Sequence, residues 1–330
     1  MDPVDTLALA IYSVTILLGL PANILALYIF YHRARARLTP NLIYMINLCL
    51  SDLAFILILP LKILEVVPPG WSPTSFLCPL YSLAHFGTVY ASTCFLTAVS
   101  AGRYLGAAFP IRYQLYKKPL YSCLVCVAIW TLVAFHGILL LILETSLGAN
   151  ATLFMGNGSA CYQEFSPEQL ALLAPVRLEL SVALFFLPLA IMVFCYASCI
   201  HVLIKSRLHE QKKRREVRLA VATLSVFVLC FGPYNLSHVV GYARSEDVWW
   251  RRVALLPSAC NAFLDPLIFY FLSSAKDQGL AWVWRSMGQR LGKGTRKRTL
   301  VTTAQGKCLL LESSGDWTTG LLGSISNSGR

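Results

Sequence analysis

Seven long apolar stretches divide the chain, and the segments between them are short and mostly polar. The stretches lie near residues 7-31, 41-66, 76-101, 120-143, 170-204, 219-242 and 253-272. Each is long enough to cross a hydrocarbon core of ~30 Å as a helix that rises ~1.5 Å per residue. The pattern predicts an all-α membrane protein, a bundle of seven transmembrane helices. Because seven is odd, the two ends of the chain lie on opposite sides of the membrane.

Charge placement predicts the orientation of this bundle. The net charge of +12 alone would suggest nucleic acid, but only five of the 28 Lys and Arg fall toward the outer face when the N-terminus is outside. Those five are Lys62, Arg177, Arg244, Arg251 and Arg252. We therefore expect a multi-pass protein of the plasma membrane, with no nucleic acid partner. Its basic inner segments would contact anionic membrane lipid and acidic partners.

The sequence predicts one membrane domain followed by a tail. Residues Ala275 to Leu291 alternate apolar and polar side chains, which favours an amphipathic eighth helix on the inner membrane surface. We place the membrane domain at 1-291. Gly, Ser and Thr dominate 292-330, and we expect a disordered cytoplasmic tail there.

Features of the outer loops support the same topology. Cys78 and Cys161 are the two cysteines in outward-facing regions, and we expect a disulfide between them in the oxidising compartment. Glycosylation sequons begin at Asn150 and Asn157 in the second outer loop. Asn235 also begins a sequon, but it lies within the sixth stretch, where glycosylation is not expected.

Several polar side chains lie at similar depth within the apolar stretches, where each needs a partner or a purpose. They are Asp52, Ser92, Asn261 and Asp265. Their oxygen atoms could bind a small hard cation such as Na⁺, and a hydrogen-bonded network without an ion is the alternative. No other cofactor is expected. Prolines 188, 233 and 266 interrupt the last three stretches, and kinked helices suit a protein that switches between two packings.

From about Gly19 to Leu291 the chain resembles the rhodopsin-like (class A) G-protein-coupled receptors. The matching motifs are Gly19-Leu-Pro-Ala-Asn23, Asn47…Asp52, Cys78, Trp130, Pro188…Tyr196, Cys230-Phe231-Gly-Pro233 and Asn261…Asp265-Pro266. The resemblance implies coupling to a heterotrimeric G protein through Arg103, Tyr104 and the basic third inner loop. It also implies a receptor kinase and arrestin as further partners.

The chain departs from the usual pattern of that family at three places. Gly102 replaces the acid that precedes Arg103-Tyr104, so the usual resting ion pair is missing and we expect raised basal activity. Phe231 stands where a tryptophan is usual. Asp265-Pro266 replaces Asn-Pro in the seventh stretch.

A narrower resemblance points to the free fatty acid receptors. It is carried by Ala101–Pro110, Pro175–Leu180, Phe231–His238 and Trp249–Arg251. In that family, arginines of spans five and seven hold the carboxylate of the fatty acid. Arg177 and Arg251 match them, and a guanidinium offers a planar fork of donors that suits a carboxylate.

Further candidate ligand residues surround these two arginines in the expected fold. They are His238, Tyr90, Tyr234, His136, His85, Asn235 and Glu144. Alternatives remain open: Arg251 could extend to the outer interface, and Arg177 could pair with Glu144, Glu164 or Glu179. A glutamate could also hold Arg177 until a ligand carboxylate displaces it. Histidines at such positions pack in the core more often than they contact a ligand, and core packing is the alternative for His85 and His136.

The chain length of the ligand is ambiguous from the motifs. Pro175–Leu180 and His238 resemble the short-chain receptors, whereas His85, Glu144 and Arg33–Pro40 resemble the long-chain receptor. We favour short-chain carboxylates because His238 lies near the head group, with a medium-chain or long-chain ligand as the alternative. A monocarboxylate transporter would bind the same anion but usually has paired repeats. No nucleophile–base or metal-ligand motif indicates an enzyme.

Overall fold

The computed structural model describes residues 2–67, 77–116, 118–146, 167–206, 209–271, 299–302 and 308–311. Most of the described chain is helical. The helices are α1 (Pro3–Ala36), α2 (Pro40–Val66), α3 (Leu77–Ala108), α4 (Pro110–Tyr116), α5 (Pro119–Ser146), α6 (Pro167–Ser181), the π-helical turn η1 (Val182–Phe186), α7 (Leu187–Lys205), α8 (Glu210–Arg244) and α9 (Arg251–Phe271).

These helices confirm the predicted bundle of seven spans. The continuous run α6–η1–α7 forms the fifth span, and α4 is a seven-residue helix between the third and fourth spans. Six of the spans are long and apolar enough to cross a membrane. The remaining span, α3, has 32 residues and is long enough, but His, Ser and Thr side chains make it more polar.

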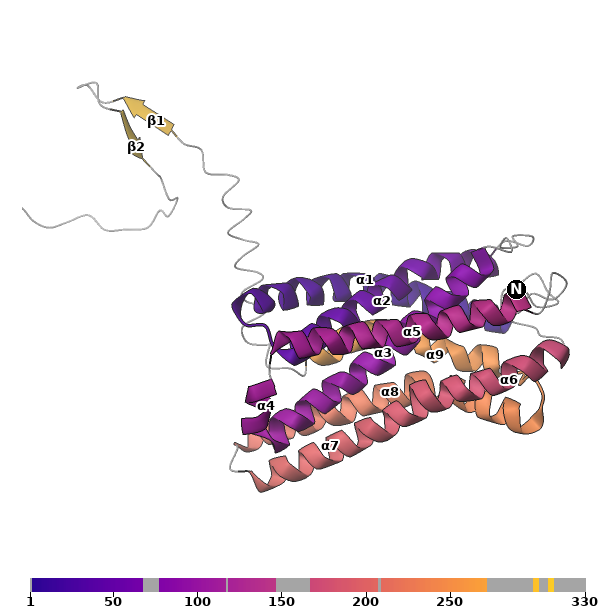
Figure 1. Cartoon of the computed structure of the whole chain (residues 1–330). Coiled ribbons are helices and arrows are strands. Elements are labelled where there is room, and N and C mark those ends of the chain that lie inside the picture. Colours follow the sequence, from indigo (N-terminus) through magenta and orange to yellow (C-terminus); the bar gives the residue numbers. More distant parts are fainter. Residues whose placement is uncertain are drawn as a thin grey trace, which may run out of the picture. The chain divides into compact units, whose positions relative to one another are not determined.

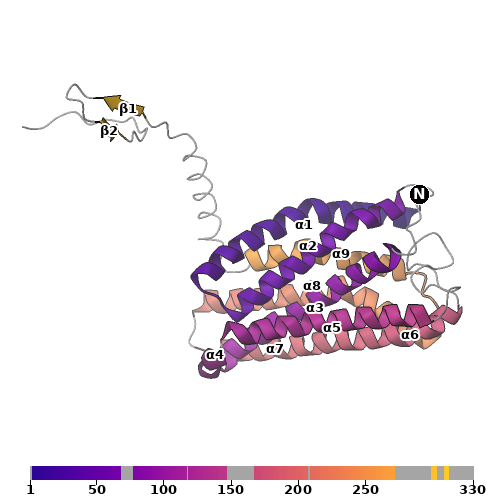
Figure 2. The same cartoon turned by 45° about the horizontal axis from the view of Figure 1, so that its top comes forward.

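The long helices run side by side, and α1 packs against both α2 and α9 (Figure 1). Both views place the N-terminus and the start of α6 at one end of the bundle and α4 at the other (Figure 2). This arrangement agrees with an N-terminus outside and α4 at the inner face. The start of α9 therefore lies at the outer face, as the prediction for Arg251 requires.

Local sequence explains where several helices begin and how the fifth span accommodates its proline. The side chain of Asp2 accepts a hydrogen bond from the backbone N–H of Val4, and Pro3 opens α1. Pro188 cannot donate a backbone hydrogen bond within the span. The chain widens into η1 just before it, where the N–H of Leu187 reaches the carbonyl of Val182.

The core lies between the helices and combines aromatic packing with buried polar contacts. Phe227 is fully buried, stacks on Phe185 at 5.4 Å between ring centroids, and meets Phe231 edge to face. The side chain of Asn23 is also buried, and it donates hydrogen bonds to the carbonyl oxygens of Gly19 and Ala262, at 3.0 and 2.6 Å. This second bond ties α1 to α9, so the polar residue serves the packing of the bundle.

The C-terminal part of the chain forms a separate compact unit that begins at Leu280. Its described residues are two short antiparallel strands, β1 (Thr299–Thr302) and β2 (Cys308–Leu311). The predicted amphipathic helix over Ala275 to Leu291 lies outside the described residues. Disorder in the remainder of 292-330 stays a prediction.

Candidate ligand pocket

Two buried arginines meet one aspartate near the outer end of the bundle. Arg177 of α6 and Arg251 at the start of α9 are 5% and 6% exposed. Asp247 lies between them, with its carboxylate oxygens 4.0 Å from Arg177 Nη1 and 3.1 Å from Arg251 Nη2. The space around the three side chains is small, about 10 Å³. An acidic group of the protein therefore occupies the position between the arginines.

The backbone that places Asp247 turns sharply at the end of α8. Ser245 adopts the left-handed conformation, with φ of 53°, and its N–H closes the last turn of the helix. The next N–H, of Glu246, donates to the carbonyl of Gly241 at 3.2 Å. A Cβ on Gly241 would lie 3.2 Å from the carbonyl oxygen of Glu246, so the absence of a side chain permits this close turn. The turn directs the chain back over the arginines.

Glutamates were the predicted partners of Arg177, and the structure adds Asp247 to them. Glu179 instead contacts His136, whose Nε2 lies 3.4 Å from the glutamate Oε1. The side chains of Glu144 and Glu164 lie outside the described residues. Asp247 precedes Arg251 by four residues, and that spacing of opposite charges is the signal that could have identified it.

A larger cavity, of about 380 Å³, extends from Arg177 and His238 into the space between α3 and α5. Tyr90, Tyr234 and His136 also line it. The rest of its wall is predominantly apolar and includes Leu80, Leu83, Gly87, Val133, Gly137, Ile138, Leu140, Leu141, Leu180 and Leu184. A cavity of this shape can hold an amphipathic molecule with its polar end at the arginine and its apolar part between the two helices.

The polar end of this cavity is built on one face of α8. Tyr234 and His238 are one turn apart, and their rings meet edge to face with centroids 4.3 Å apart. Tyr234 also stacks on Phe86 of α3, at 5.8 Å. Both α8 side chains are buried, so neighbouring rings hold them in fixed orientations toward the cavity.

Two of the predicted ligand residues lie elsewhere in the structure. His85 is 1% exposed and packs between the rings of Phe55 and Phe86, which fits the core alternative better than ligand contact. Asn235 is buried and donates to the carbonyl of Phe231 at 2.9 Å, within its own helix. Neither side chain lines the described cavities.

The predicted cation-binding residues meet in the middle of the bundle. Ser92 Oγ lies 3.3 Å from Asp52 Oδ1, and Asn261 Nδ2 donates to Asp265 Oδ2 at 2.8 Å. A cavity of about 10 Å³ is lined by Asp52, Ser92, Asn261 and Phe231. Among the described residues, no group of three or more His, Cys, Asp or Glu is arranged to bind a metal ion. The space between the residues is large enough for one water-sized particle.

Arg103 at the inner end of α3 pairs with an acid of another helix, because Gly102 stands where the family usually has an acid. Its Nη1 lies 3.8 Å from Glu216 Oε2 of α8, and its guanidinium lies over the ring of Phe269. The space beside Gly102 is filled by Asn41 of α2, whose Oδ1 a Cβ at Gly102 would meet. The ion pair with an acid at position 102 is absent, as expected, and Arg103 instead pairs with Glu216 on another helix, which the sequence did not indicate.

The Glu216→Gln variant is expected to raise ligand-free signalling by about two- to fivefold. The carboxylate is 42% exposed, and an exposed pair contributes about 0.2–1 kcal/mol to the packing of α3 against α8. G-protein activation without ligand, at matched surface expression, measures this effect. Glu210→Gln is the control, because Glu210 is an exposed acid of the same helix that pairs with Lys213. Unchanged basal signalling would show that the pair does not stabilise the resting state.

The remaining switch residues are packed within the bundle. Tyr104 contacts the rings of Phe109 and Phe194, and Pro233 lies inside α8 one residue before Tyr234. Pro266 follows Asp265 inside α9. The predicted disulfide and glycosylation residues lie outside what the structure describes: Cys161, Asn150, Asn157 and the side chain of Cys78.

Comparison with known proteins identifies the family. Residues 22–269 match the 7 transmembrane receptor (rhodopsin family). Free fatty acid receptor 1 of Rattus norvegicus is 40% identical over 87% of this chain and 98% of its own length. Free fatty acid receptor 2 of Homo sapiens is 39% identical over 89% of this chain and 92% of its own length. Free fatty acid receptor 3 of Mus musculus is 40% identical over 80% of this chain and 82% of its own length.

The family match runs from within α1 to near the end of α9, and the family consists of receptors rather than enzymes. They agree with the predicted topology and with the apolar helices of the structure. The chain therefore belongs to the rhodopsin family of seven-transmembrane receptors and, within it, to the free fatty acid receptors, as a multi-pass receptor of the plasma membrane.

Proposed function

We propose that the receptor binds a free fatty acid with its carboxylate at Arg177 and Arg251 and its tail in the cavity between α3 and α5. The observation that carries this proposal is an apolar cavity that ends at a buried guanidinium. Buried arginine needs an anion, and a carboxylate can accept two parallel hydrogen bonds from it. His238 and Tyr90 line the same cavity and can donate further hydrogen bonds to the head group.

Asp247 supports this assignment because its own carboxylate already bridges the two arginines. A ligand carboxylate has the same charge and shape, so it can replace Asp247 as the partner of Arg177 and Arg251. Asp247 is 29% exposed at the side chain and lies in a turn, where it can move into solvent when displaced. The exchange of one carboxylate for another leaves the arginines paired throughout.

Two observations point to different ligand lengths. His238 beside the head group favours short-chain acids, whereas a cavity of about 380 Å³ has room for a longer apolar tail. We give the volume more weight, because a short acid would leave most of the apolar wall without contacts. Medium-chain and long-chain acids are therefore the favoured ligands, and short-chain acids are the alternative.

Ligand binding would bias the packing of α8 against its neighbours. Tyr234 lines the ligand cavity, and Phe231, one turn further in, lines the small polar cavity at Asp52. We propose Na⁺ as a cation near Asp52 and Asp265, because a cation would stabilise two buried carboxylates in the same part of the bundle. A shift of α8 would then release Arg103 from Glu216 at the inner face.

The inner face would bind a heterotrimeric G protein through Arg103 and the basic start of α8. A receptor kinase, arrestin and anionic lipid are further proposed partners of the basic inner segments and tail. The alternative from another class is a monocarboxylate transporter. Membership of the receptor family favours signalling over transport.

Calcium and cAMP responses of transfected cells to saturated acids from acetate to palmitate test the proposal. The methyl ester of each acid is the matched control, because it keeps the tail and removes the negative charge. We expect responses to acids and none to esters. If no acid of any chain length gave a response while surface expression was normal, the carboxylate ligand would be refuted. Uptake of radiolabelled acid in the same cells, without signalling, would favour the transporter.

A further inference from the structure

Three arginines gather at the inner end of α1, in a segment that the fatty acid site does not use. Arg33 and Arg35 lie in the last turn of the helix, and Arg37 follows it. The backbone of Arg37 is extended, and its N–H donates to the carbonyl oxygen of Arg33 at 2.8 Å. Figures 1 and 2 both show α1 running from the N-terminus to the opposite end of the bundle. The three side chains therefore begin near the inner membrane surface.

The last turns of α1 present a basic and aromatic surface. Arg35 and Arg37 are exposed, and Arg33 is half-buried. The guanidinium of Arg35 lies over the ring of Tyr31, 5.7 Å from its centroid, and Tyr31 is itself 54% exposed. Tyr31 and Arg35 are one turn apart, so they share one outward face of the helix. An exposed tyrosine beside arginines is typical of a helix end at the level of the lipid head groups.

Acids of the protein do not neutralise these arginines within the part of the chain that the structure describes. The sequence has no Asp or Glu between Asp5 and Asp52, and Asp52 is buried in the middle of the bundle. Toward the inner end the described acids are Glu210 and Glu216 of α8, and each pairs with a cation of α3 or α8. The charge at the end of α1 is therefore complementary to an anion from outside the protein.

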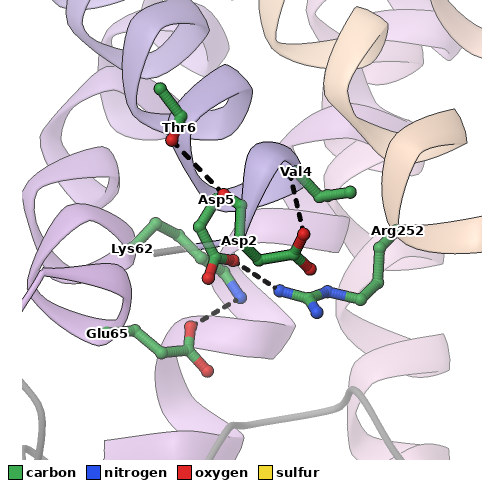
Figure 3. A network of polar contacts seen from close by, with 7 residues as sticks. All are labelled: Asp2, Val4, Asp5, Thr6, Lys62, Glu65 and Arg252. Carbon is green, nitrogen blue, oxygen red and sulfur yellow. Dashed lines mark hydrogen bonds and ion pairs between the residues drawn. The ribbon is translucent and has the colours of Figure 1, made fainter.

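The outer end of the same helix has the opposite arrangement. There Arg252 Nη2 lies 2.8 Å from Asp5 Oδ1, and Lys62 Nζ lies 3.3 Å from Glu65 Oε2 (Figure 3). Both of these outer cations thus pair with an acid of the protein. The two ends of α1 differ in this respect, which singles out the inner arginines as cations that suit an anionic surface.

We propose that the inner end of α1 binds a phosphoinositide, an inner-leaflet phospholipid whose inositol ring carries phosphate groups. Arginine offers a planar fork of donors to phosphate oxygens, and several phosphates on one ring can engage several guanidiniums. Residues 33–36 rise only ~6 Å along the helix, so one head group can reach all three long side chains. Basic segments directly after a membrane helix are typical of sites for this lipid class. The proposal narrows the contact with anionic lipid in the proposed function to one segment and one class of lipid.

Binding of a fluorescent phosphatidylinositol bisphosphate to the purified full-length receptor in detergent micelles tests this surface. We expect saturable binding that the unlabelled lipid displaces. Phosphatidylserine carries a single net charge and engages fewer guanidiniums, so it should displace the probe at least tenfold less well. Soluble inositol trisphosphate lacks acyl chains and should also displace the probe at least tenfold less well. The assay needs neither fatty acid nor G protein, so this proposal and the fatty acid site can fail independently.

A triple variant connects the binding to the three arginines. Arg33→Gln, Arg35→Gln and Arg37→Gln together remove the charge from an exposed helix end. Each arginine near an anionic lipid contributes about fivefold in affinity, so this variant should weaken binding at least tenfold. Replacement of the same three residues by lysine keeps the charge without the planar fork, and it should recover part of the loss.

The matched control removes the same charge from another helix at the inner face. It replaces three exposed cations at the start of α8, as Lys212→Gln, Arg214→Gln and Arg218→Gln. Because these residues lie outside the proposed site, binding should change by less than about threefold. Thermal melting shows whether both triple variants are folded.

Four results would overturn the proposal. The first is the absence of saturable binding to folded receptor. The second is displacement by phosphatidylserine as strong as by the unlabelled probe, which would show attraction to charge alone. The third is equally strong displacement by inositol trisphosphate, which would identify a soluble phosphate as the ligand. The fourth is an α1 variant that binds as well as the parent, or no better and no worse than the α8 control.

Discussion

Replacement of Arg177 or Arg251 by alanine is expected to lower the potency of an activating fatty acid by about 30-fold or more. Loss of one partner from a buried, hydrogen-bonded charge pair costs about 2–5 kcal/mol, and each 1.4 kcal/mol is about tenfold in affinity. Both arginines are buried and contact one carboxylate. Each variant therefore removes one of the two guanidiniums that would hold the carboxylate of the ligand. Concentration–response curves in transfected cells measure the shift.

A lysine variant separates the effect of positive charge from that of the guanidinium shape. Lysine keeps the charge but lacks the planar fork of donors, so Arg177→Lys should lose less potency than Arg177→Ala and still fall short of the parent. Arg244→Ala is the control for charge alone, because Arg244 is exposed and lies outside the described cavities. Full potency in both alanine variants would remove the arginines from the ligand site.

Asp247→Asn is expected to act in the opposite direction. Removal of a competing carboxylate that is 29% exposed should raise ligand potency by up to about fivefold, because a partly exposed pair contributes about 1 kcal/mol or less. A loss of potency would instead mean that Asp247 aligns the two arginines for the ligand. The same curves distinguish the two roles by the sign of the shift.

Potency should rise with the length of the fatty acid by about fourfold for each methylene, until the tail fills the cavity. Each buried methylene contributes about 0.8 kcal/mol. Gly137→Leu tests this directly: the nearest atom to a Cβ there is Leu83 Cδ2 at 3.9 Å, so a side chain fits and takes up tail space. The loss of about two methylenes of contact would lower the potency of decanoate by about tenfold or more.

Short acids provide the internal comparison for that variant. Propionate does not reach the blocked space, so Gly137→Leu should change its potency by less than about twofold. Val127→Leu is the matched control, because Val127 lies on the same helix, is 61% exposed and does not line the cavity. Equal losses for propionate and decanoate, or a flat length series in the parent, would contradict a tail between α3 and α5.

Hydrophobicity predicted the membrane spans because it is a local property of the chain. Positions of charged residues along those spans were also predictable, since Arg177 and Arg251 both lie at the outer end where helix rise places them. Contacts between residues far apart in the sequence could not be predicted in this way. Asp247 reaches Arg177 because Ser245 turns the chain back, and Glu216 reaches Arg103 because α8 packs near α3.

The two histidines also show that the sequence does not report contacts between helices. From the sequence, contact with the ligand and packing in the core were both open for His85 and His136. The rings of Phe55 and Phe86 enclose His85, whereas His136 lines the cavity. The difference is decided by aromatic neighbours from two helices, and no spacing within α3 or α5 reports it.

The π-helical turn in the fifth span lets the ligand site tolerate a change in residue count at one place only. Residues 182–186 contain one residue more than a regular α-helix would need over the same rise. Loss of one residue there would restore a regular α-helix and leave α6 and α7 in nearly the same relative orientation. Loss of one residue from the regular helix between Arg177 and the turn would instead rotate Arg177 by ~100° and move it by ~1.5 Å, which would carry its guanidinium out of the cavity. We therefore expect insertions or deletions among related receptors to fall within residues 182–186 rather than beside Arg177.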